Sequence, residues 1–290
     1  MNKPSELIRL LRPHQWVKNG FVFIGLLFGH AWQDHLLVYR VVAAFIAFSF
    51  VSSFIYIIND IADKDIDKLH PEKRRRPLAA GTVTMGAAIT LGVLVISLGL
   101  CLGVLASYLV LVFLLIYIAL NLLYSFGLKQ IVILDVFIIA TGFMLRIFAG
   151  TIGVGIPPSQ WLLLCGFMIT LFLGLTKRRS EMFALADNKT AQRKVLEHYT
   201  PVLLDKMISI SAACVIISYG LYTMSPDTIQ IHETGSLIYT IPFVVYGIFR
   251  YIFLLHYQQT GGEPSRDLFR DPHIVGAVAA WFIVSLWLIA

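Results

Sequence analysis

Long apolar stretches recur along this chain of 290 residues, and they constrain its fold more than any other feature. Runs of about 20 apolar residues alternate with short polar breaks, and that length lets an α-helix cross the hydrocarbon core of a bilayer. The chain is 58% hydrophobic and only 14% charged. The sequence therefore predicts an all-α, polytopic membrane protein.

The hydropathy pattern predicts nine transmembrane helices. The first is the weakest, because it is short and contains three glycines. The expected spans lie near residues 17–31, 38–58, 85–104, 107–124, 131–150, 161–175, 207–224, 237–257 and 274–290. Only the connections 59–84 and 176–206 are long enough to build polar structure, so we expect residues 1–290 to form a single membrane-embedded domain.

The basic residues predict the orientation of these helices. When the connections are assigned alternately to the two sides, twenty Lys and Arg residues fall on the side of the N-terminus and only Arg40 on the other. Basic connections stay in the cytoplasm, so the N-terminus and both long loops are expected to be cytoplasmic, in a bacterial inner membrane. This distribution also accounts for the net charge of +6 without a nucleic-acid partner.

The segment NDIADKDIDKLHPEKRRRP, residues 59–77, holds five acids and six bases. If the second span continues as a helix, Asn59, Asp60, Asp63 and Asp67 lie within an arc of about 100°. Oxygen ligands of this kind suit Mg²⁺, which one or two carboxylates and substrate phosphates typically hold. The segment thus predicts a magnesium–diphosphate site. The alternative is a solvated loop whose acids pair with neighbouring lysines.

The pattern N-D-x-x-D-x-x-x-D at residues 59–67 resembles the first aspartate-rich motif of the UbiA superfamily of intramembrane transferases. The resemblance is closest to the decaprenyl-phosphate phosphoribosyltransferase branch of that superfamily. It is carried, in chain order, by RPHQWVKN (12–19), NDIADKDIDKLHPEKRRRPLAAG (59–81), YSFGLK (124–129), LDVFIIATGFMLRIFAG (134–150) and TKRRSE (176–181). The resemblance implies a nine-helix bundle with cytoplasmic cap loops and Mg²⁺ as cofactor.

The same resemblance implies the two substrates. The donor is 5-phosphoribosyl 1-diphosphate and the acceptor is decaprenyl phosphate or a similar polyprenyl phosphate, so that diphosphate is released. The alternative is a UbiA-type aromatic prenyltransferase that uses a polyprenyl diphosphate. Such enzymes carry a second motif of the DxxxD type after the sixth span, whereas Glu181 and Asp187 are spaced too far apart to match it.

The candidate site residues follow from the motifs and from their expected positions. Asp60, Asp63 and Asp67 are the candidate catalytic residues, and together with Asn59 they are the candidate metal ligands. Lys18 and Asn19, at the start of the first span, are candidates for the lipid phosphate. Candidates for the donor diphosphate and ribose are Lys73, Arg74, Arg76, Tyr124, Lys129, Asp135, Lys177, Arg178 and Glu181.

Several of these residues have structural alternatives. Asp135 could instead pair with Lys129 or cap its helix, and Glu181 could form helical ion pairs with Lys177 or Arg178. Arg146 lies deeper in its span, where a structural role is favoured.

A secondary transporter is the rival of a different class. It would place ionisable residues near the midplane, whereas this chain concentrates them at one membrane face. The expected partners are the two substrates and the lipid bilayer, and the sequence leaves homo-oligomer formation open.

Overall fold

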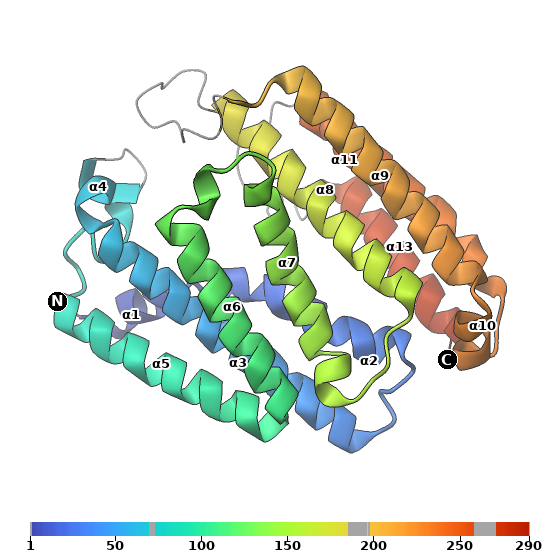
Figure 1. Cartoon of the computed structure of the whole chain (residues 1–290), viewed down its shortest axis with the longest axis horizontal. Coiled ribbons are helices and arrows are strands. Elements are labelled where there is room, and N and C mark those ends of the chain that lie inside the picture. The colour runs from blue at the N-terminus through green and yellow to red at the C-terminus, as the bar shows by residue number, and fades with distance from the viewer. Residues whose placement is uncertain (1, 70–72, 185–195, 197, 258–270, 290) are drawn as a thin grey trace. The chain divides into compact units, whose positions relative to one another are not determined.

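The computed structural model describes residues 2–69, 73–184, 196, 198–257 and 271–289. All regular elements in these ranges are helices (Figure 1). The α-helices and 3₁₀ helices (η) are α1 (Pro4–Leu11), η1 (Pro13–Phe23), α2 (Ile24–Phe28), α3 (His35–Ala62), α4 (Lys64–Leu69), η2 (Lys73–Arg75), α5 (Met85–Ala106), α6 (Tyr108–Phe126), η3 (Leu128–Gln130), α7 (Leu134–Ala149), η4 (Ile152–Val154), α8 (Gln160–Ala184), α9 (Pro201–Met224), α10 (Pro226–His232), η7 (Ser236–Thr240), α11 (Ile241–Tyr257) and α13 (Pro272–Ile289).

Eight helical stretches of the described residues are long and apolar enough to cross a membrane. They coincide with the second to ninth predicted spans, and the prediction of an all-α, polytopic membrane protein is confirmed. The first predicted span, 17–31, differs from the others because it consists of η1 and the five-residue helix α2. The chain is an integral membrane protein.

The segment formed by η1 and α2 nevertheless runs antiparallel to α3 over most of its length. At one end, Arg12 contacts Asp60, and the indole of Trp16 donates a hydrogen bond to Ser53. Further along, the ring of Phe23 packs on Phe45, with centroids 5.2 Å apart. Eleven residues of 3₁₀ helix followed by five of α-helix can extend about 30 Å, which is the thickness of the hydrocarbon core of a bilayer.

Two compact units divide the chain. Unit 1 contains residues 1–126 and 145–157, and unit 2 contains residues 127–144 and 158–290. Helix α7 begins in unit 2 and ends in unit 1. Each unit has its own buried apolar cluster, centred on Phe48 and Leu114 in unit 1 and on Phe172 and Leu204 in unit 2. The expectation of a single transferase domain stays a prediction.

In unit 1, α3 and α5 pack closely because α5 presents glycine to α3. A Cβ atom at Gly99 would lie 3.0 Å from Val51 Cγ2 and 3.2 Å from the carbonyl oxygen of Ala47. Both helices have side-chain N-caps: Asp34 accepts hydrogen bonds from the first turn of α3, and Thr84 does the same for α5.

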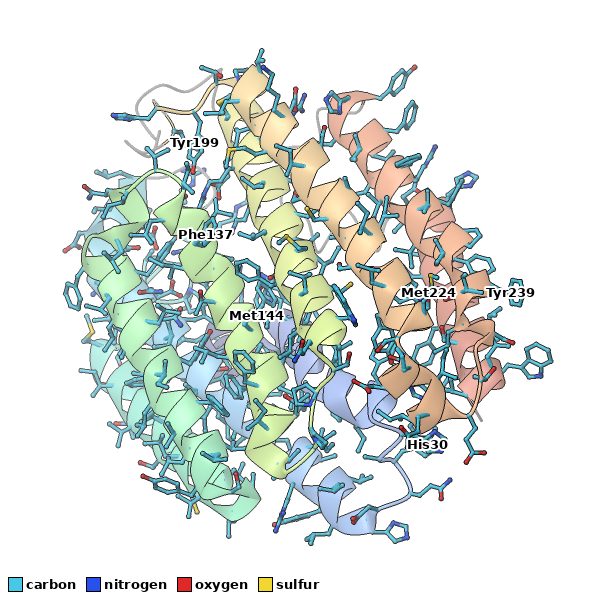
Figure 2. All side chains as sticks on the ribbon, turned by 45° about the vertical axis from the view of Figure 1, so that its right-hand side comes forward. His30, Phe137, Met144, Tyr199, Met224 and Tyr239 are labelled. Atoms are coloured by element: carbon cyan, nitrogen blue, oxygen red, sulfur yellow. The ribbon has the colours of Figure 1, made fainter. Side chains whose placement is uncertain are left out.

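In unit 2, α8 packs against α9 and α11 packs against α13. Thr200 caps α9 by accepting a hydrogen bond from the backbone N–H of Leu203. Figure 2 shows Tyr199 at one end of this unit, towards the first turns of α7, and Met224 and Tyr239 at the opposite end. The polar cluster described below lies at the Tyr199 end.

Candidate active site

The acidic motif lies where α3 ends and α4 begins, in unit 1. Asp63 is the C-cap of α3 and its N–H donates to the carbonyl oxygen of Asn59. The N–H of Asp67 donates in turn to the carbonyl oxygen of Asp63. Because these bonds link residues four apart, Asn59, Asp63 and Asp67 follow a near-helical path across the break between the two helices.

Two of the aspartates are buried and paired with arginines. Arg12 Nη2 lies 2.5 Å from Asp60 Oδ1. Arg76 Nη1 lies 3.1 Å from the same oxygen and 2.7 Å from Asp67 Oδ2. Asp60 and Asp67 are each only 2% exposed. Two guanidinium groups therefore neutralise two carboxylates that burial would otherwise disfavour.

The side chains at this site fit a hard divalent cation. Asp60 Oδ2 is buried and has no hydrogen-bond partner in the part of the chain that the structure describes. Ser125 donates to Asn59 Oδ1, and Asp63 is partly exposed. Within that same part, no three His, Cys, Asp or Glu side chains are grouped closely enough to hold a metal by themselves. This donor set suits Mg²⁺, which typically completes its coordination with water and substrate phosphates.

Asp65, the remaining aspartate of this segment, differs from Asp60 and Asp67 in exposure and in its partner. Asp65 is exposed and pairs with Lys68 at 2.7 Å. The hydrogen bond from Lys68 lowers the pKa of Asp65. Pairing with a neighbouring lysine, the alternative interpretation of the segment, therefore holds for Asp65, while Asp60 and Asp67 pair with arginines.

The basic candidates of unit 1 differ in burial and in their contacts. Lys73 and Arg74 lie in η2 and are exposed, whereas Arg76 contacts Asp60 and Asp67 directly. Tyr124 lies on α6, one residue before Ser125. Lys18 lies in η1 and is partly buried.

Asn19 is buried within unit 1. Its side-chain amide donates to Ser49 Oγ at 3.1 Å and accepts from Arg146 Nε at 2.7 Å. Asn19 is only 1% exposed. The predicted contacts of Lys18 and Asn19 with a lipid phosphate stay predictions.

A second polar cluster lies in unit 2, where the start of α7 meets α8. Arg178 Nε lies 2.6 Å from Asp135 Oδ2, and both side chains are fully buried. Arg178 also forms an ion pair with Glu181, and Lys177 Nζ lies 3.9 Å from the same carboxylate. The helical ion pairs of Glu181 are thus present. The alternative in which Asp135 pairs with Lys129 is wrong for the described residues, because Asp135 pairs with Arg178.

Tyr199, which the sequence analysis did not single out, completes this cluster. Its hydroxyl donates to Asp135 Oδ1 at 2.9 Å and accepts from the N–H of Ile133 at 2.7 Å. Ile133 has φ of 68°, a left-handed conformation that is rare for a β-branched residue. Tyr199 therefore fixes both the carboxylate and the strained turn before α7. Lys129, in η3, precedes the same turn.

Arg12 is the other functional candidate that the sequence analysis missed. It starts the RPHQWVKN motif, but 48 residues separate it from Asp60, so spacing along one helix could not connect the two. Its backbone is left-handed, with φ of 53°, although it is not a glycine. Such conformations are enriched at functional sites, but only the tertiary structure reveals this one.

Arg250 belongs to neither of these two clusters, and Asp187 lies outside the described residues. Arg250, on α11, pairs with Asp271 at 2.8 Å, and the hydrogen bond from Arg250 lowers the pKa of Asp271.

The sequence is similar to curated enzymes over nearly its whole length. It is 35% identical to the decaprenyl-phosphate phosphoribosyltransferase of Corynebacterium glutamicum, covering 97% of this chain and 85% of that protein. It is 34% identical to the enzyme of the same name from Mycolicibacterium smegmatis, covering 97% of this chain and 91% of that protein.

The fold is similar to that of a solved membrane protein. A UbiA homolog from Archaeoglobus fulgidus, bound to DMAPP and Mg²⁺, superimposes with a TM-score of 0.73 at 19% identity, covering 98% of this chain and 99% of that one. Residues 20–270 match the UbiA prenyltransferase family. The chain therefore belongs to the UbiA prenyltransferase family and is a membrane-embedded transferase.

Proposed function

We propose that this protein transfers 5-phosphoribose from 5-phosphoribosyl 1-diphosphate to a polyprenyl phosphate such as decaprenyl phosphate. The similarity to two enzymes named decaprenyl-phosphate phosphoribosyltransferase supports this choice. The observation that carries the proposal is the alternation of buried carboxylates and guanidinium groups at Asp60, Asp67, Arg12 and Arg76. A site of this kind can bind both a metal ion and the anionic oxygens of a diphosphate.

Asn59, Asp60, Asp63 and Asp67 are the residues that would hold Mg²⁺. When bound, the metal would supply positive charge that stabilises the leaving diphosphate. Asp60 Oδ2 could contact the metal, since no described residue forms a hydrogen bond with this atom. Arg12 and Arg76 already contact the carboxylates, and they can exchange these partners for phosphate oxygens of the donor.

The reaction needs little acid–base chemistry. The bond between C1 of the ribose and the diphosphate oxygen breaks, and its electron pair leaves with the diphosphate. A phosphate oxygen of the acceptor supplies the pair for the new bond to C1. Because that oxygen is already anionic, no general base is required, and positioning with electrostatic stabilisation provides the acceleration.

The remaining candidate residues, apart from the buried Asn19, each have a role in this proposal. Lys73, Arg74, Lys129 and Lys177 bind donor phosphates by charge. Tyr124, Asp135, Arg178 and Glu181 orient the ribose or the bases that hold the phosphates, and Lys18 binds the phosphate of the lipid. The positive-inside pattern supports a cytoplasmic N-terminus and active site in a bacterial inner membrane.

An aromatic prenyltransferase that uses a polyprenyl diphosphate is the second candidate. Its support is the family itself and the solved homolog that binds DMAPP and Mg²⁺. The segment after the sixth span argues against it, because Lys177, Arg178 and Arg179 dominate there. Two anionic substrates need such cations more than an aromatic acceptor does.

The decisive experiment compares the two donors directly. Purified protein in lipid vesicles with Mg²⁺ should convert 5-phosphoribosyl 1-diphosphate, labelled with ³²P at the 5-phosphate that stays on the ribose, and polyprenyl phosphate into a labelled lipid. Asp63→Ala should abolish the transfer, whereas Asp65→Ala, which alters the exposed acid two residues away, should retain it. Prenylation of an aromatic acid without label transfer from the ribose donor would select the second candidate.

A further inference from the structure

The 3₁₀ helix η1 needs support from outside itself. It extends over 11 residues, whereas runs of 3₁₀ helix longer than three or four residues are uncommon. Backbone of this kind persists at membrane depth only where it is buried in protein or lines a cavity. The contacts of η1 with other elements therefore decide where its side chains lie.

One of these contacts comes from Arg146, in the part of α7 that belongs to unit 1, and the same side chain also reaches α3 and α6. Its guanidinium donates to Asn19 Oδ1 of η1 at 2.7 Å. It also donates to Tyr117 Oη of α6 at 3.0 Å and to Ser52 Oγ of α3 at 3.4 Å. The guanidinium carbon lies 4.7 Å from the ring centroid of Tyr117 and 5.7 Å from that of Phe48.

This network is buried and joins four elements. Arg146 is 6% exposed and Asn19 is 1% exposed. A charged side chain inside a span costs at least about 2.5 kcal/mol at mid-membrane and usually marks a functional position. The acceptors of Arg146 named above are all uncharged, so these contacts are hydrogen bonds and not ion pairs.

We propose that Arg146 is a positioning residue of the acceptor subsite. It holds the amide of Asn19, and through it the stretch of η1 that carries Lys18. The inference rests on the proposed function, in which Lys18 binds the phosphate of the polyprenyl acceptor. Asn19 serves as the buried anchor of η1, because both ends of its amide are already engaged by Arg146 and Ser49.

The donor side of η1 has a separate anchor. Arg12 follows α1, whose N-terminal flank is tied to the start of α5 by hydrogen bonds between Asn2 and Thr84. Thr82 also donates to Glu6 of α1. Loss of Arg146 should therefore disturb the position of Lys18 more than the contact between Arg12 and Asp60.

Steady-state kinetics on vesicles containing the full chain test this proposal. Arg146→Gln and Asn19→Ala should each raise the KM for polyprenyl phosphate about tenfold, and the KM for the ribose donor should stay within about twofold. Arg146→Lys should recover part of the loss, since an ammonium can reach one acceptor but cannot reproduce the planar fork. Arg250→Lys, which alters an arginine within a span of unit 2, should leave both constants unchanged.

A double-mutant cycle separates positioning from general damage. If Arg146 acts through Asn19, the double variant should be no worse than the more affected single variant. Additive effects, or equal rises in both KM values, would overturn the proposal.

Hydrogen exchange provides a readout that does not depend on ribose transfer. In Arg146→Gln, backbone amides of residues 13–23 should exchange faster, while those of α5 and α9 should be unaffected. If the wild type transferred no ribose but the Arg146→Gln variant still showed this faster exchange, the proposed function would be refuted and the anchoring of η1 would be supported. Unchanged exchange at residues 13–23 would refute the anchoring.

Discussion

At the scale of single residues, the aspartates of one short segment differ in burial and in the bases with which they pair. Asp60 and Asp67 are almost completely buried and share Arg76, whereas the side chain of Asp65 is 88% exposed and pairs with Lys68. A buried ion pair costs desolvation free energy that only good geometry offsets. Removing Arg76 would leave two buried carboxylates poorly compensated.

Arg76→Gln is therefore expected to lower the free energy of unfolding by about 3 kcal/mol and to raise the KM for the ribose donor. Arg75→Gln is the matched control, because Arg75 is the neighbouring exposed residue. Thermal unfolding in detergent and donor titrations would measure both effects. Equal behaviour of the two variants would contradict the role of Arg76.

The hydroxyl of Tyr199 gives a prediction about pH. Burial is the largest cause that raises the pKa of Tyr199 from 10.0 to about 12. The folded state thus keeps the proton at pH values where the unfolded state loses it. The stabilisation is fully present below pH 10 and is lost as the pH rises towards 12.

Tyr199→Phe should lower the free energy of unfolding by about 1–3 kcal/mol at neutral pH, because Ile133 N–H and Asp135 Oδ1 lose a buried partner. The difference from the wild type should shrink between pH 10 and 12. Unfolding curves at each pH would measure it, with Tyr239→Phe, at a side chain 72% exposed, as control. A difference that stays constant up to pH 12 would refute this account.

At the scale of elements, glycine decides where helices and irregular segments approach closely. A Cβ atom at Gly150 would lie 1.7 Å from the carbonyl oxygen of Val22, so the end of α7 touches the backbone of η1. A Cβ atom at Gly25, on α2, would likewise lie 2.2 Å from the carbonyl oxygen of Gly150. This approach explains why glycine stands at position 25 of the first predicted span, where a side chain would collide with the backbone after α7.

The interface of α3 with α5 yields a matched pair of substitutions. Gly99→Leu should destabilise unit 1 by about 1–3 kcal/mol, because the new side chain collides with Val51 and the backbone of Ala47. Gly86→Ala on the same helix should be neutral or slightly stabilising, since nothing lies within 4 Å of its added Cβ. Denaturation in detergent would rank the two variants, and equal stability would contradict this packing.

At the scale of the whole molecule, the course of residues 13–28 determines the topology. The N-terminal residues contact the chain near Thr82 and Thr84, which follow the Asp60 end of α3. Asp34 caps the opposite end of that helix. A ninth crossing by η1 and α2 would therefore return the N-terminus to the side of the acidic motif.

Labelling with a membrane-impermeant maleimide would test this topology in a variant that lacks Cys101, Cys165 and Cys214. Cysteines introduced at Ser5 and Lys68 should react from the cytoplasmic side, and one at Gln33 from the other. All three positions are exposed in the structure. Labelling of Ser5 and Gln33 from the same side would show that residues 13–28 do not cross.

The regular helices were predictable because each depends on local sequence. About 20 apolar residues satisfy their own backbone hydrogen bonds as a helix in a bilayer, whatever surrounds them. The acidic face at residues 59–67 was predictable for a similar reason, since helical geometry alone places Asn59, Asp63 and Asp67 in line. The 3₁₀ course of η1 was not, because its contacts with α3 and α7 come from distant residues.

The sequence by itself determined the membrane class, the positions of eight helices and the segment where the acids gather, because hydropathy and helical periodicity act over short distances. Only the tertiary structure decided which polar side chains meet. Arg12 reaches Asp60 across 48 residues, Tyr199 reaches Asp135 across 64, and Arg146 reaches Asn19 across 127. Which polar side chains pair in a buried site depends on which helices pack together, and spacing along the sequence does not reveal which helices those are.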